Sequence, residues 1–381
     1  FLESETPFLQ EKFKNIIFMP LLKGSIRPNF SSLSVDDSYN ILYAKKARMF
    51  IRTLHSFDLY KSLFFHRRTL FKKKMLIACI KQQIHVQIIK RIIKNNPSNF
   101  TEDTIVYSYW FNAPVYAFLK IRKKYRMKYR VVCRAHRWDV YDENGDMPYR
   151  RYCIEHIDKI FPISQDACDF LTKKYGYKDK YILSRLGVQK QNVTTKESPP
   201  FNFQVLTVSQ LIQRKRVDLV LSALTEFASK NKDVNVRWTH FGTGDMEKDL
   251  KMKASSIDIP NMRTTFMGYV PNVEIMQFME ESKVDVFINL STSEGVPVSI
   301  MEAQSYGIPV IATNVGGTGE IIDKDNGILL SPCPTLEDVV SALEKVYQSD
   351  FNRDIIKNHW NKLSNAQINF KHFVDILSNI Q

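Results

Sequence analysis

A strand–helix–strand pattern in residues 284–320 most limits what this chain can fold into. Two apolar runs of strand length enclose a helical pattern, and the three segments are Val284–Leu290, Val298–Tyr306 and Ile308–Ala312. Pro297 precedes the helix, where the fixed φ angle of proline suits the first turn. Two strands joined by a helix form a parallel βαβ unit, so this pattern predicts an α/β fold.

Two carboxylates lie around the start of this predicted helix. Glu294 falls in the loop ahead of it, and Glu302 lies about one and a half turns inside it. A glycine-rich turn, 315–320, comes after the second strand. Ligands of open α/β sheets bind at the carboxyl ends of the strands, near free helix amides. We therefore expect a ligand site here; the alternative is a salt-bridged helix residue and a loop cap.

Strands and helices alternate regularly beyond a polar, proline-interrupted stretch at 193–202. The strands are expected at 203–208, 234–241 and 264–267, the helices at 217–230, 245–254 and 272–281, and a helical region from Thr335. This alternation predicts a doubly wound domain over 203–381, whose last helix packs back on the first domain. The proline-interrupted stretch is the expected linker.

The N-terminal half, 1–192, has a similar but less regular pattern. Helices are expected at 6–13, 38–95 and 113–123, and strands at 15–21, 104–109, 129–134 and 159–162. We therefore expect a second α/β domain. Two such domains would enclose a cleft, which is where ligand sites most often lie.

The excess positive charge is confined to the first 150 residues. Residues 1–150 hold 28 Lys and Arg against 12 Asp and Glu, whereas residues 151–381 hold 26 against 28. Such an imbalance predicts an anionic partner, either a membrane leaflet or nucleic acid. Solvated helix faces in a lysine-rich proteome are the alternative. No nucleic-acid-binding module or aromatic stacking motif accompanies the charge, so no nucleic-acid partner is expected.

The cysteines and the apolar runs bear on the compartment. The five cysteines show neither C-x-x-C nor metal-ligand spacing, which is typical of a reduced, cytosolic protein. No apolar run is long enough to span a membrane, since the nearest, 75–89, contains Lys81, Gln82, Gln83 and His85. The chain begins at Phe1, without a signal-peptide layout.

Together these motifs resemble the retaining nucleotide-sugar glycosyltransferases of family 4. That family has the GT-B fold, in which two Rossmann-like doubly wound domains face a central cleft. The resemblance covers 201–381 and, more weakly, 1–190. Its strongest part is Glu294-Gly-Val-Pro-Val-Ser-Ile-Met-Glu302, set between a strand and the Gly316-Gly317 turn.

The resemblance implies a role for each carboxylate in binding a UDP-sugar or GDP-sugar donor. Glu302 would accept hydrogen bonds from the ribose hydroxyls, and Glu294 would contact the donor sugar. Backbone amides from Val296 to Ser299 would face the sugar and phosphate. The other donor-binding residues that it implies are Gln210, Arg214, Gly242, Gly268, Tyr269, Val270, Gly295, Val296, Pro297, Val298 and Ser299.

Residues 208–218 resemble the segment whose cations bind the donor phosphates in this family. Lys215 falls on the family lysine, but Ser209-Gln210 replaces the usual Gly-Arg pair. Arg214 is a neighbouring cation that would supply the missing charge. A solvated charge cluster is the alternative, although cations at a helix N-terminus oppose the helix dipole and call for an anion.

His136 is the candidate from the N-terminal half. Residues 131–141 resemble the segment in which the family carries His-Gly-x-Asp after a strand, with Arg137 in place of the glycine. His136, Lys215 and Glu294 are then the catalytic candidates, and a structural histidine is the alternative for His136. Residues 2–11 resemble the segment that the family carries after its first strand and loop, so that strand is expected to be missing from the chain as given.

The resemblance implies a retaining, metal-independent glycosyltransferase that needs no cofactor. It would move a sugar to a polyprenyl-linked or saccharide acceptor in capsule, O-antigen or exopolysaccharide biosynthesis. The expected location is cytoplasmic, peripheral on the inner face of the plasma membrane, which supplies the anionic surface. A non-catalytic GT-B protein that binds nucleotide or glycan is the alternative.

Overall fold

A parallel β-sheet forms the centre of each of the two units of the chain. The computed structural model describes residues 2–21, 33–54, 59–60, 73–141 and 149–380. Unit 1 comprises 1–163, 167–184 and 373–381, and unit 2 comprises 164–166 and 185–372. The stretch 193–202, expected to be a linker, lies within unit 2.

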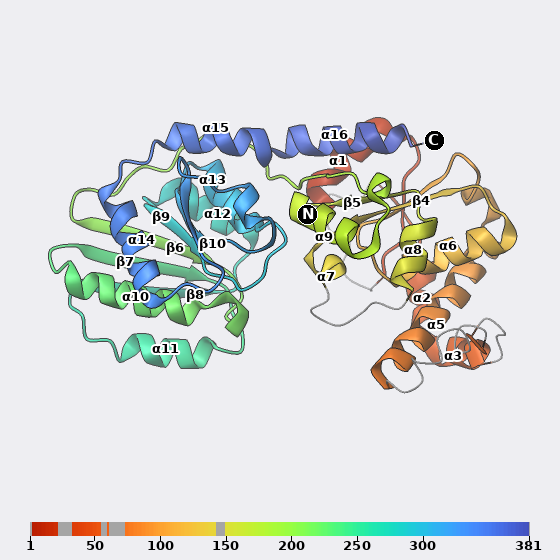
Figure 1. Cartoon of the computed structure of the whole chain (residues 1–381), viewed down its shortest axis with the longest axis horizontal. Helices are drawn as coiled ribbons and strands as arrows, with labels where there is room; N and C mark the ends of the chain where they lie inside the picture. The colour runs from red at the N-terminus through yellow and green to blue at the C-terminus, as the bar shows by residue number, and fades with distance from the viewer. Residues whose placement is uncertain (1, 22–32, 55–58, 61–72, 142–148, 381) are drawn as a thin grey trace. The chain divides into compact units, whose positions relative to one another are not determined.

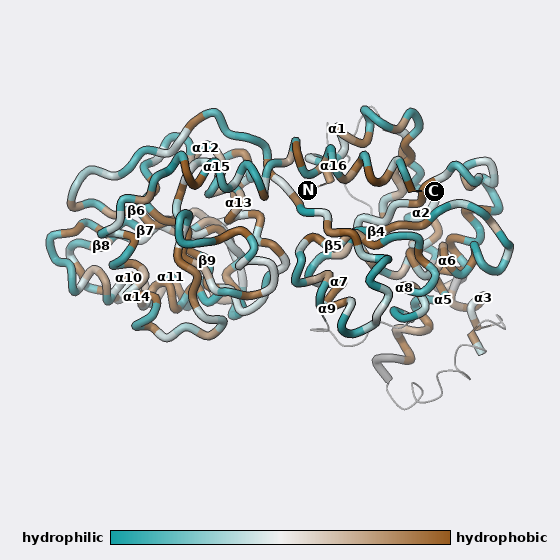
Figure 2. Tube along the Cα trace, turned by 45° about the horizontal axis from the view of Figure 1, so that its top comes forward, coloured by the Kyte–Doolittle hydropathy of each residue, from teal (hydrophilic) through white to brown (hydrophobic). Residues whose placement is uncertain are grey.

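Unit 2 is built on a six-stranded parallel sheet with the strand order β11-β10-β9-β6-β7-β8. The strands are β6 (Asn202–Val208), β7 (Asn235–Phe241), β8 (Met262–Gly268), β9 (Val286–Asn289), β10 (Val310–Thr313) and β11 (Gly327–Leu330). Every residue of β9 and β10 is buried, because central strands of a parallel sheet are covered on both faces. Figure 2 shows hydrophobic residues within strands such as β6 and β9.

Helices cover both faces of this sheet. They are α10 (Val217–Lys230), α11 (Glu247–Ser255), α12 (Asn272–Glu281), α13 (Val298–Ser305), α14 (Leu336–Gln348) and α15 (Arg353–Leu363). Figure 1 shows α10 and α14 on one face and α12 and α13 on the other. Val220, Leu224 and Phe227 recur on one side of α10 and are buried in the core, as the helical period requires.

The order of the strands places a switch point between β6 and β9. From β6 the chain proceeds outward through β7 and β8, then returns to pair β9 with the other edge of β6 and continues to β10 and β11. At such a point the connections after the two strands leave in opposite directions and open a crevice at their carboxyl ends. The loops that begin at Ser209 and Leu290 border this crevice.

Unit 1 is built on a three-stranded parallel sheet of order β3-β4-β5 and a two-stranded sheet of β1 and β2. Its strands are β1 (Ile17–Phe18), β2 (Ser34–Val35), β3 (Ile105–Ser108), β4 (Arg130–Ala135) and β5 (Lys159–Pro162). Its helices are α1 (Leu2–Lys12), α2 (Ser38–Ala44), α3 (Lys46–Leu54), α5 (Lys73–Asn95), α6 (Ala113–Tyr125), α7 (Arg137–Val140), α8 (Arg150–His156) and α9 (Gln165–Tyr175). The last helix, α16 (Ala366–Ser378), begins in unit 2 and ends in unit 1.

Most elements occur where the sequence predicts them. The helix 217–230 coincides with α10 and the strand 159–162 with β5, whereas the strand expected at 15–21 is only the two residues of β1. β11 is not among the strands expected from the sequence; it is four residues long and comes after the turn-forming Asp325-Asn326. Of the helical region 38–95, residues 55–58 and 61–72 lie outside the described part of the chain.

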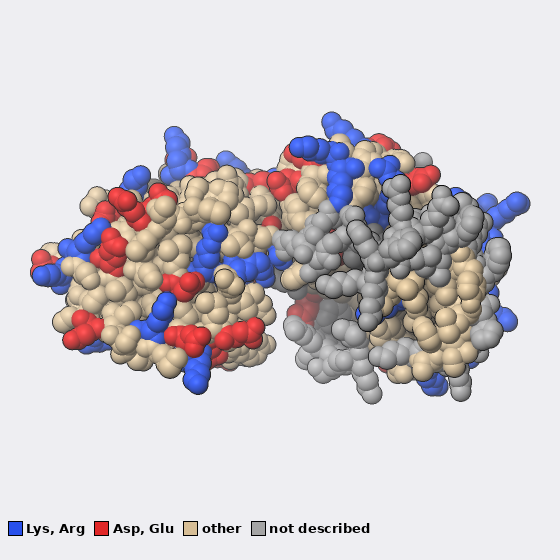
Figure 3. Space-filling model, turned by 60° about the horizontal axis from the view of Figure 1, so that its bottom comes forward, with Lys and Arg blue, Asp and Glu red and all other residues tan. Residues whose placement is uncertain are grey.

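The surface of unit 2 carries charges of both signs. Over unit 2, Figure 3 shows basic residues interspersed with acidic ones, in keeping with the near-neutral balance of 151–381. Among the described helices, none combines the length and the apolar character that crossing a membrane requires.

A buried ion pair joins the first helix to the sheet of unit 1. Arg134 on β4 donates through Nε to Glu5 Oε2 of α1 at 2.8 Å, and neither side chain is exposed to solvent. Arg134 also donates to the backbone oxygen of Ser184 at 2.9 Å, and Tyr107 donates to the other carboxylate oxygen of Glu5 at 2.8 Å. These bonds satisfy the charges that burial would otherwise penalise, so α1 is held by polar contacts as well as by packing.

Arg134→Met should destabilise the protein strongly, because it leaves the carboxylate of Glu5 buried without its cation. The expected loss of unfolding free energy is about 3–5 kcal/mol. Urea unfolding followed by circular dichroism measures it. The control is Lys128→Met, whose partner Glu102 is 3.1 Å away and exposed, so that its loss should be at most about 1 kcal/mol. Equal losses in the two variants would contradict the assigned role of the buried pair.

Candidate functional site

An ion pair connects the two loops that border the switch point. Lys215 ends the short 3₁₀ helix η6 (Gln213–Lys215) after β6, and its Nζ lies 2.5 Å from Oε1 of Glu294 in the loop after β9. Both side chains are largely buried, with 16% and 11% of their surface exposed. Ser291 donates to the same carboxylate oxygen at 2.6 Å, and Asn289 lies 3.5 Å from it. Because β6 pairs with β9, residues separated by 79 positions meet here.

The carboxylate of Glu294 is held in its charged form. Burial alone would raise its pKa, but Lys215, Ser291 and the nearby charge of Arg214 together hold the pKa below the ordinary 4.5. A charged carboxylate is a strong hydrogen-bond acceptor for hydroxyl groups. Glu294 is therefore suited to bind a polyhydroxylated ligand rather than to donate a proton near neutral pH.

Arg214 and the backbone join the same two loops. Arg214 donates through Nη1 to the backbone oxygen of Ser293 at 3.2 Å, and the amide of Thr292 donates to the backbone oxygen of Arg214 at 2.8 Å. Arg216, the third cation, donates to the backbone oxygen of Pro332 at 2.8 Å and so turns toward the loop after β11. Lys215 thus pairs with Glu294 and Arg214 bonds to the adjacent Ser293, whereas Arg216 has a different partner.

A glycine turn supports Glu294 from the neighbouring strand. Gly316, after β10, has φ of +54°, and a Cβ there would overlap the backbone oxygen of Glu294. The amide of Gly317 donates to the backbone oxygen of Gly295 at 2.6 Å. Only glycine permits this approach without both backbone strain and a steric clash. The turn therefore fixes the peptide that carries the carboxylate.

Glu302 lies on α13, in a different environment. The helix begins after Pro297, which serves as its N-cap with φ of −70°, and Val298 and Ser299 in its first turn are half-buried. Asn272, the first residue of α12, donates through Nδ2 to Oε1 of Glu302 at 2.9 Å. Burial raises the pKa of Glu302, and the bond from Asn272 opposes part of that rise. The bond to Oε1 orients the carboxylate and leaves its second oxygen able to accept a further hydrogen bond.

The loops after β6, β7 and β8 are joined through their backbones. The amide of Gly242 donates to the oxygen of Gly268 at 2.8 Å, and a Cβ on Gly242, whose φ is +132°, would overlap the backbone oxygen of Ser209. The amide of Leu211 donates to the oxygen of Thr243 at 2.9 Å. The loops after β6, β7 and β8 form the rim of the switch point. These main-chain bonds hold that rim in one conformation.

Three further predicted donor-binding residues, in addition to Gly242 and Gly268, lie on this rim. Tyr269 is 82% exposed and Gln210 is also exposed, whereas Val270 is half-buried. Their side chains are therefore available to solvent or to a ligand. Gly295, Val296 and Pro297, in the loop beside Glu294, are buried.

His136 belongs to unit 1, at the end of β4. Its ring is buried against Trp110 and Tyr109, with ring centroids 4.4 and 4.9 Å away. Nε2 lies 3.1 Å from the backbone oxygen of Tyr109, and because a carbonyl only accepts, Nε2 carries the proton. Burial and the charge of Arg134 lower the pKa of His136 to about 3, so the ring is neutral near pH 7. The catalytic role stays a prediction.

Sequence reasoning did not identify three polar partners of the glutamates, namely Asn289, Ser291 and Asn272. Asn289 ends a buried strand and Ser291 precedes Glu294 by three residues, which is a signal that could have been used. Asn272 reaches Glu302 from another helix, and no spacing in the sequence indicates that contact.

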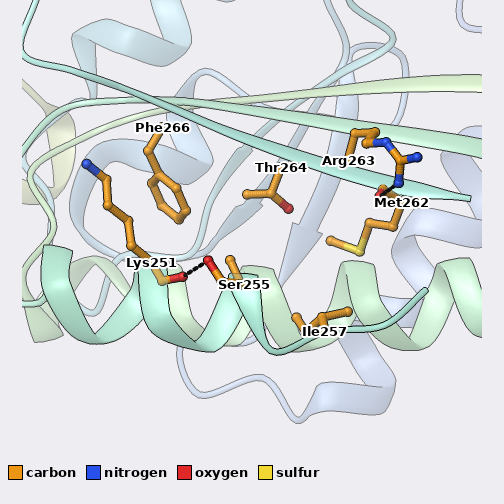
Figure 4. A pocket seen from close by; sticks show the side chains of 8 residues that line it. Lys251, Ser255, Ile257, Met262, Arg263, Thr264 and Phe266 are labelled. Carbon is orange, nitrogen blue, oxygen red and sulfur yellow. Dashed lines mark hydrogen bonds between the residues drawn. The ribbon is translucent and has the colours of Figure 1, made fainter. Parts of the chain in front are cut away.

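Neither a metal cluster nor the described pocket coincides with these residues. Within the described residues, no group of three His, Cys, Asp or Glu side chains could hold a metal ion. A pocket of about 360 Å³ lies between α11 and β8, lined by Lys251, Ala254, Ser255, Ile257, Met262, Arg263, Thr264 and Phe266 (Figure 4). It contains none of the predicted site residues.

Gly316→Ala should destabilise the protein more than Gly176→Ala does. Both glycines have positive φ, +54° and +77°, so each alanine carries a backbone strain of about 1–2 kcal/mol. Only at Gly316 does the new Cβ also meet backbone, which adds about 1–3 kcal/mol. Thermal unfolding monitored by circular dichroism compares them. Equal destabilisation would show that the turn does not constrain Glu294.

The stabilising effect of the Glu294 carboxylate should depend on pH. Its folded-state pKa lies below 4.5, so it stabilises the folded protein above that pH and loses this effect as pH falls through the folded-state pKa. The difference in unfolding free energy between the wild type and Glu294→Gln should therefore shrink in acid. Urea titrations at several pH values test this, with Glu226→Gln, whose side chain is 36% exposed, as control. A pH-independent difference would refute the assigned ionisation.

The candidate site lies in the part of the chain that is similar to a known family. Residues 189–362 match the family model of the glycosyl transferases group 1. The putative colanic acid biosynthesis glycosyltransferase WcaL of Escherichia coli (strain K12) is 24% identical over 249 residues, covering 58% of this chain and 60% of that protein. The amylovoran biosynthesis glycosyltransferase AmsK of Erwinia amylovora is 24% identical over 178 residues, covering 45% and 43%. The chain spans about half the length of the curated relatives it matches.

Solved structures agree on the fold. The lipopolysaccharide outer core galactosyltransferase WaaB, in its apo form, superposes with a TM-score of 0.64 at 19% identity, covering 78% of this chain and 80% of that one. Anabaena Alr3699/HepE, in complex with UDP and glucose, superposes with a TM-score of 0.61 at 16% identity, covering 77% and 81%. The expected α/β fold of GT-B type is confirmed. Residues 189–362, which carry Lys215, Glu294 and Glu302, are thus the part of the chain that is similar to the glycosyl transferases of group 1.

Proposed function

We propose that this protein is a retaining glycosyltransferase that moves a sugar from a nucleoside-diphosphate sugar to a saccharide or polyprenyl-linked acceptor. The observation that carries the proposal is the pairing of Lys215 with a charged Glu294 at the switch point, inside the segment that matches the family. One cation for phosphate and one acceptor for hydroxyls then lie side by side. A nucleotide sugar presents phosphate oxygens and sugar hydroxyls next to its reacting bond, and these two side chains match them.

Lys215 and Arg214 are the proposed phosphate ligands. An ammonium group has three N–H donors, and Glu294 accepts one from Lys215, so the same side chain can also donate to a diphosphate oxygen. The guanidinium of Arg214, bonded to the backbone at Ser293, lies in the same loop pair. Positive charge placed at a departing diphosphate stabilises the transition state without a proton transfer. No metal is required in this scheme.

The two glutamates are the proposed ligands of the donor's hydroxyl groups. Glu294 is ionised and would accept from hydroxyls of the transferred sugar, and the amides from Val296 to Ser299 would face the sugar and phosphate. Glu302, oriented by Asn272, would accept from the ribose through its second oxygen. Gly242, Gly268 and Tyr269 on the adjoining rim would frame the nucleobase.

The relatives support a donor and a biological setting. The HepE structure contains UDP and glucose, and the sequence relatives are named for colanic acid, amylovoran and O-antigen biosynthesis. We infer a UDP-sugar or GDP-sugar donor and an acceptor of bacterial surface-polysaccharide assembly.

Binding without transfer is the second candidate function. Gln210 stands where the resemblance expects an arginine, so one phosphate ligand of the family is replaced by a neutral, exposed side chain. A protein with this change could hold a nucleotide yet stabilise the leaving group too weakly for turnover.

The decisive experiment measures nucleoside diphosphate release from a panel of UDP-sugars and GDP-sugars with acceptor extracts. Lys215→Met should lower kcat about 10²–10³-fold, as expected for loss of a charge that stabilises the leaving group. Glu302→Gln should act mainly on KM for the donor. Lys251→Met is the matched control, because Lys251 pairs with Glu247 on the surface of α11 at 2.7 Å and should leave both constants unchanged.

The outcomes separate the two candidate functions. Nucleotide binding by calorimetry without release from any donor would establish the binding protein. If neither UDP nor GDP binds, both candidates are wrong. Equal loss in Lys215→Met and Lys251→Met would contradict the assigned site.

A further inference from the structure

Helices α2, α3 and α5 of unit 1 expose large apolar side chains. Within the described residues of 38–95, the exposed ones on these helices are Ile41, Phe50, Ile51, Leu54 and Ile77, with exposed fractions of 55%, 40%, 57%, 38% and 44%, and Tyr60, between α3 and α5, is 57% exposed. Single exposed apolar residues are ordinary, but a group on helices that contact one another marks an interaction site. Figure 1 shows α3 alongside the N-terminal half of α5, away from the three-stranded sheet.

Among the side chains of α3 that the structure describes, the burial pattern is the reverse of that of a core helix. Phe50 and Leu54, four residues apart, share a face, and Ile51 lies beside them; all three are exposed. Thr53, a polar residue, is fully buried in the same helix. A helix that faces the core normally buries its apolar side and exposes its polar one. The apolar side of α3 is therefore directed at something other than the core of unit 1.

Lysines stand beside the exposed apolar residues in a repeated arrangement. Ile41 and Lys45, around the end of α2, are four residues apart and both exposed, and Ile77 and Lys81 on α5 have the same spacing and exposure. Residues at this spacing share one face of a helix. A lysine can bury its aliphatic stem beside an apolar neighbour and keep its ammonium group in a polar layer. The arrangement suits a boundary between an apolar and an anionic phase.

The sequence around these residues is almost free of negative charge. Residues 38–95 contain 14 Lys and Arg and a single acidic residue, Asp58. An anionic leaflet attracts basic segments with about 1 kcal/mol for each cation near its surface. The combination of exposed aliphatic side chains with this charge distinguishes the partner, because a nucleic acid would use the charge but offers aliphatic groups little to bind.

We propose that Ile41, Lys45, Phe50, Ile51, Leu54, Tyr60, Ile77 and Lys81 form a docking surface for an anionic lipid bilayer. The apolar side chains enter the boundary between headgroups and acyl chains, and the lysines contact lipid phosphates. The helices lie on the bilayer rather than cross it, in the manner of interfacial amphipathic helices. This surface is separate from Lys215 and Glu294, so the proposal does not rest on the proposed function.

Vesicle flotation of the full chain tests the proposal without any donor or acceptor. The protein should float with vesicles of phosphatidylcholine and phosphatidylglycerol, bind vesicles of phosphatidylcholine alone much more weakly, and be released by added salt. The triple variant Phe50→Ser, Ile51→Ser, Leu54→Ser keeps the charge and should lower the partition coefficient about tenfold or more. A matched triple, Met252→Ser, Ile355→Ser, Ile368→Ser, changes residues of unit 2 with 56%, 48% and 48% exposure and should bind like the wild type.

A charge variant protects the test against a folding defect. Lys45→Glu with Lys81→Glu should weaken binding to the anionic vesicles and leave the thermal unfolding curve unchanged, because both side chains are exposed. Absence of wild-type binding to the anionic vesicles overturns the proposal, as does equal binding by the two serine triples. Double-stranded DNA that binds the protein with the same dependence on Lys45 and Lys81 as the vesicles would identify nucleic acid as the partner instead.

Discussion

The pairing of β9 with β6 is the constraint on which the candidate site depends. Without this return across the sheet, the loop that carries Lys215 and the loop that carries Glu294 would leave from strands far apart. With it, two segments separated by 79 residues share one edge of the sheet and exchange an ion pair and backbone hydrogen bonds. The chemistry of the site thus depends on strand order, and the helices serve to cover the sheet that maintains it.

At this edge of the sheet, the negative charge of one loop is balanced by the positive charge of the other. A carboxylate as buried as Glu294 would be costly on its own, and so would an ammonium group as buried as Lys215. The two opposite charges stabilise each other, and Ser291 adds a neutral hydrogen bond to the carboxylate oxygen of Glu294 that pairs with Lys215. An incoming diphosphate would meet a lysine already fixed in place, which limits the loss of side-chain entropy on binding.

The sequence is most informative where a residue's role depends on its own neighbours. The strand–helix–strand pattern around Glu294, the helix at α10 and the glycines of the 316–317 turn all act through local geometry, and all could be predicted. Asn272 could not, because its bond to Glu302 depends on how α12 lies beside α13. β11 is as short as the predicted strand 159–162, but it begins at Gly327 directly after a turn, and glycine is a poor strand former, so its pattern gives a weaker signal.

The predicted residues Arg214 and His136 show the limit of motif spacing in another way. Arg214 and Arg216 look equivalent in sequence, but the left-handed backbone at Arg216, with φ of +48°, sends its side chain to Pro332 while Arg214 stays with Ser293. His136 lies at the strand end where the motif places it, and only the structure reveals that its protonated nitrogen is bonded to the backbone.

The main-chain bonding of the rim has an evolutionary consequence. Since Gly242, Gly268, Leu211 and Thr243 hold the rim through peptide groups, the conformation does not depend on the side chains that project from it. Gln210 and Tyr269 are exposed there, so substitutions at these positions cost little in folding. Selection can then alter ligand preference at the rim while the ion pair between the loops and the sheet stay unchanged. Under the proposed function, mutations that are neutral for the fold would then be able to change which donor is bound.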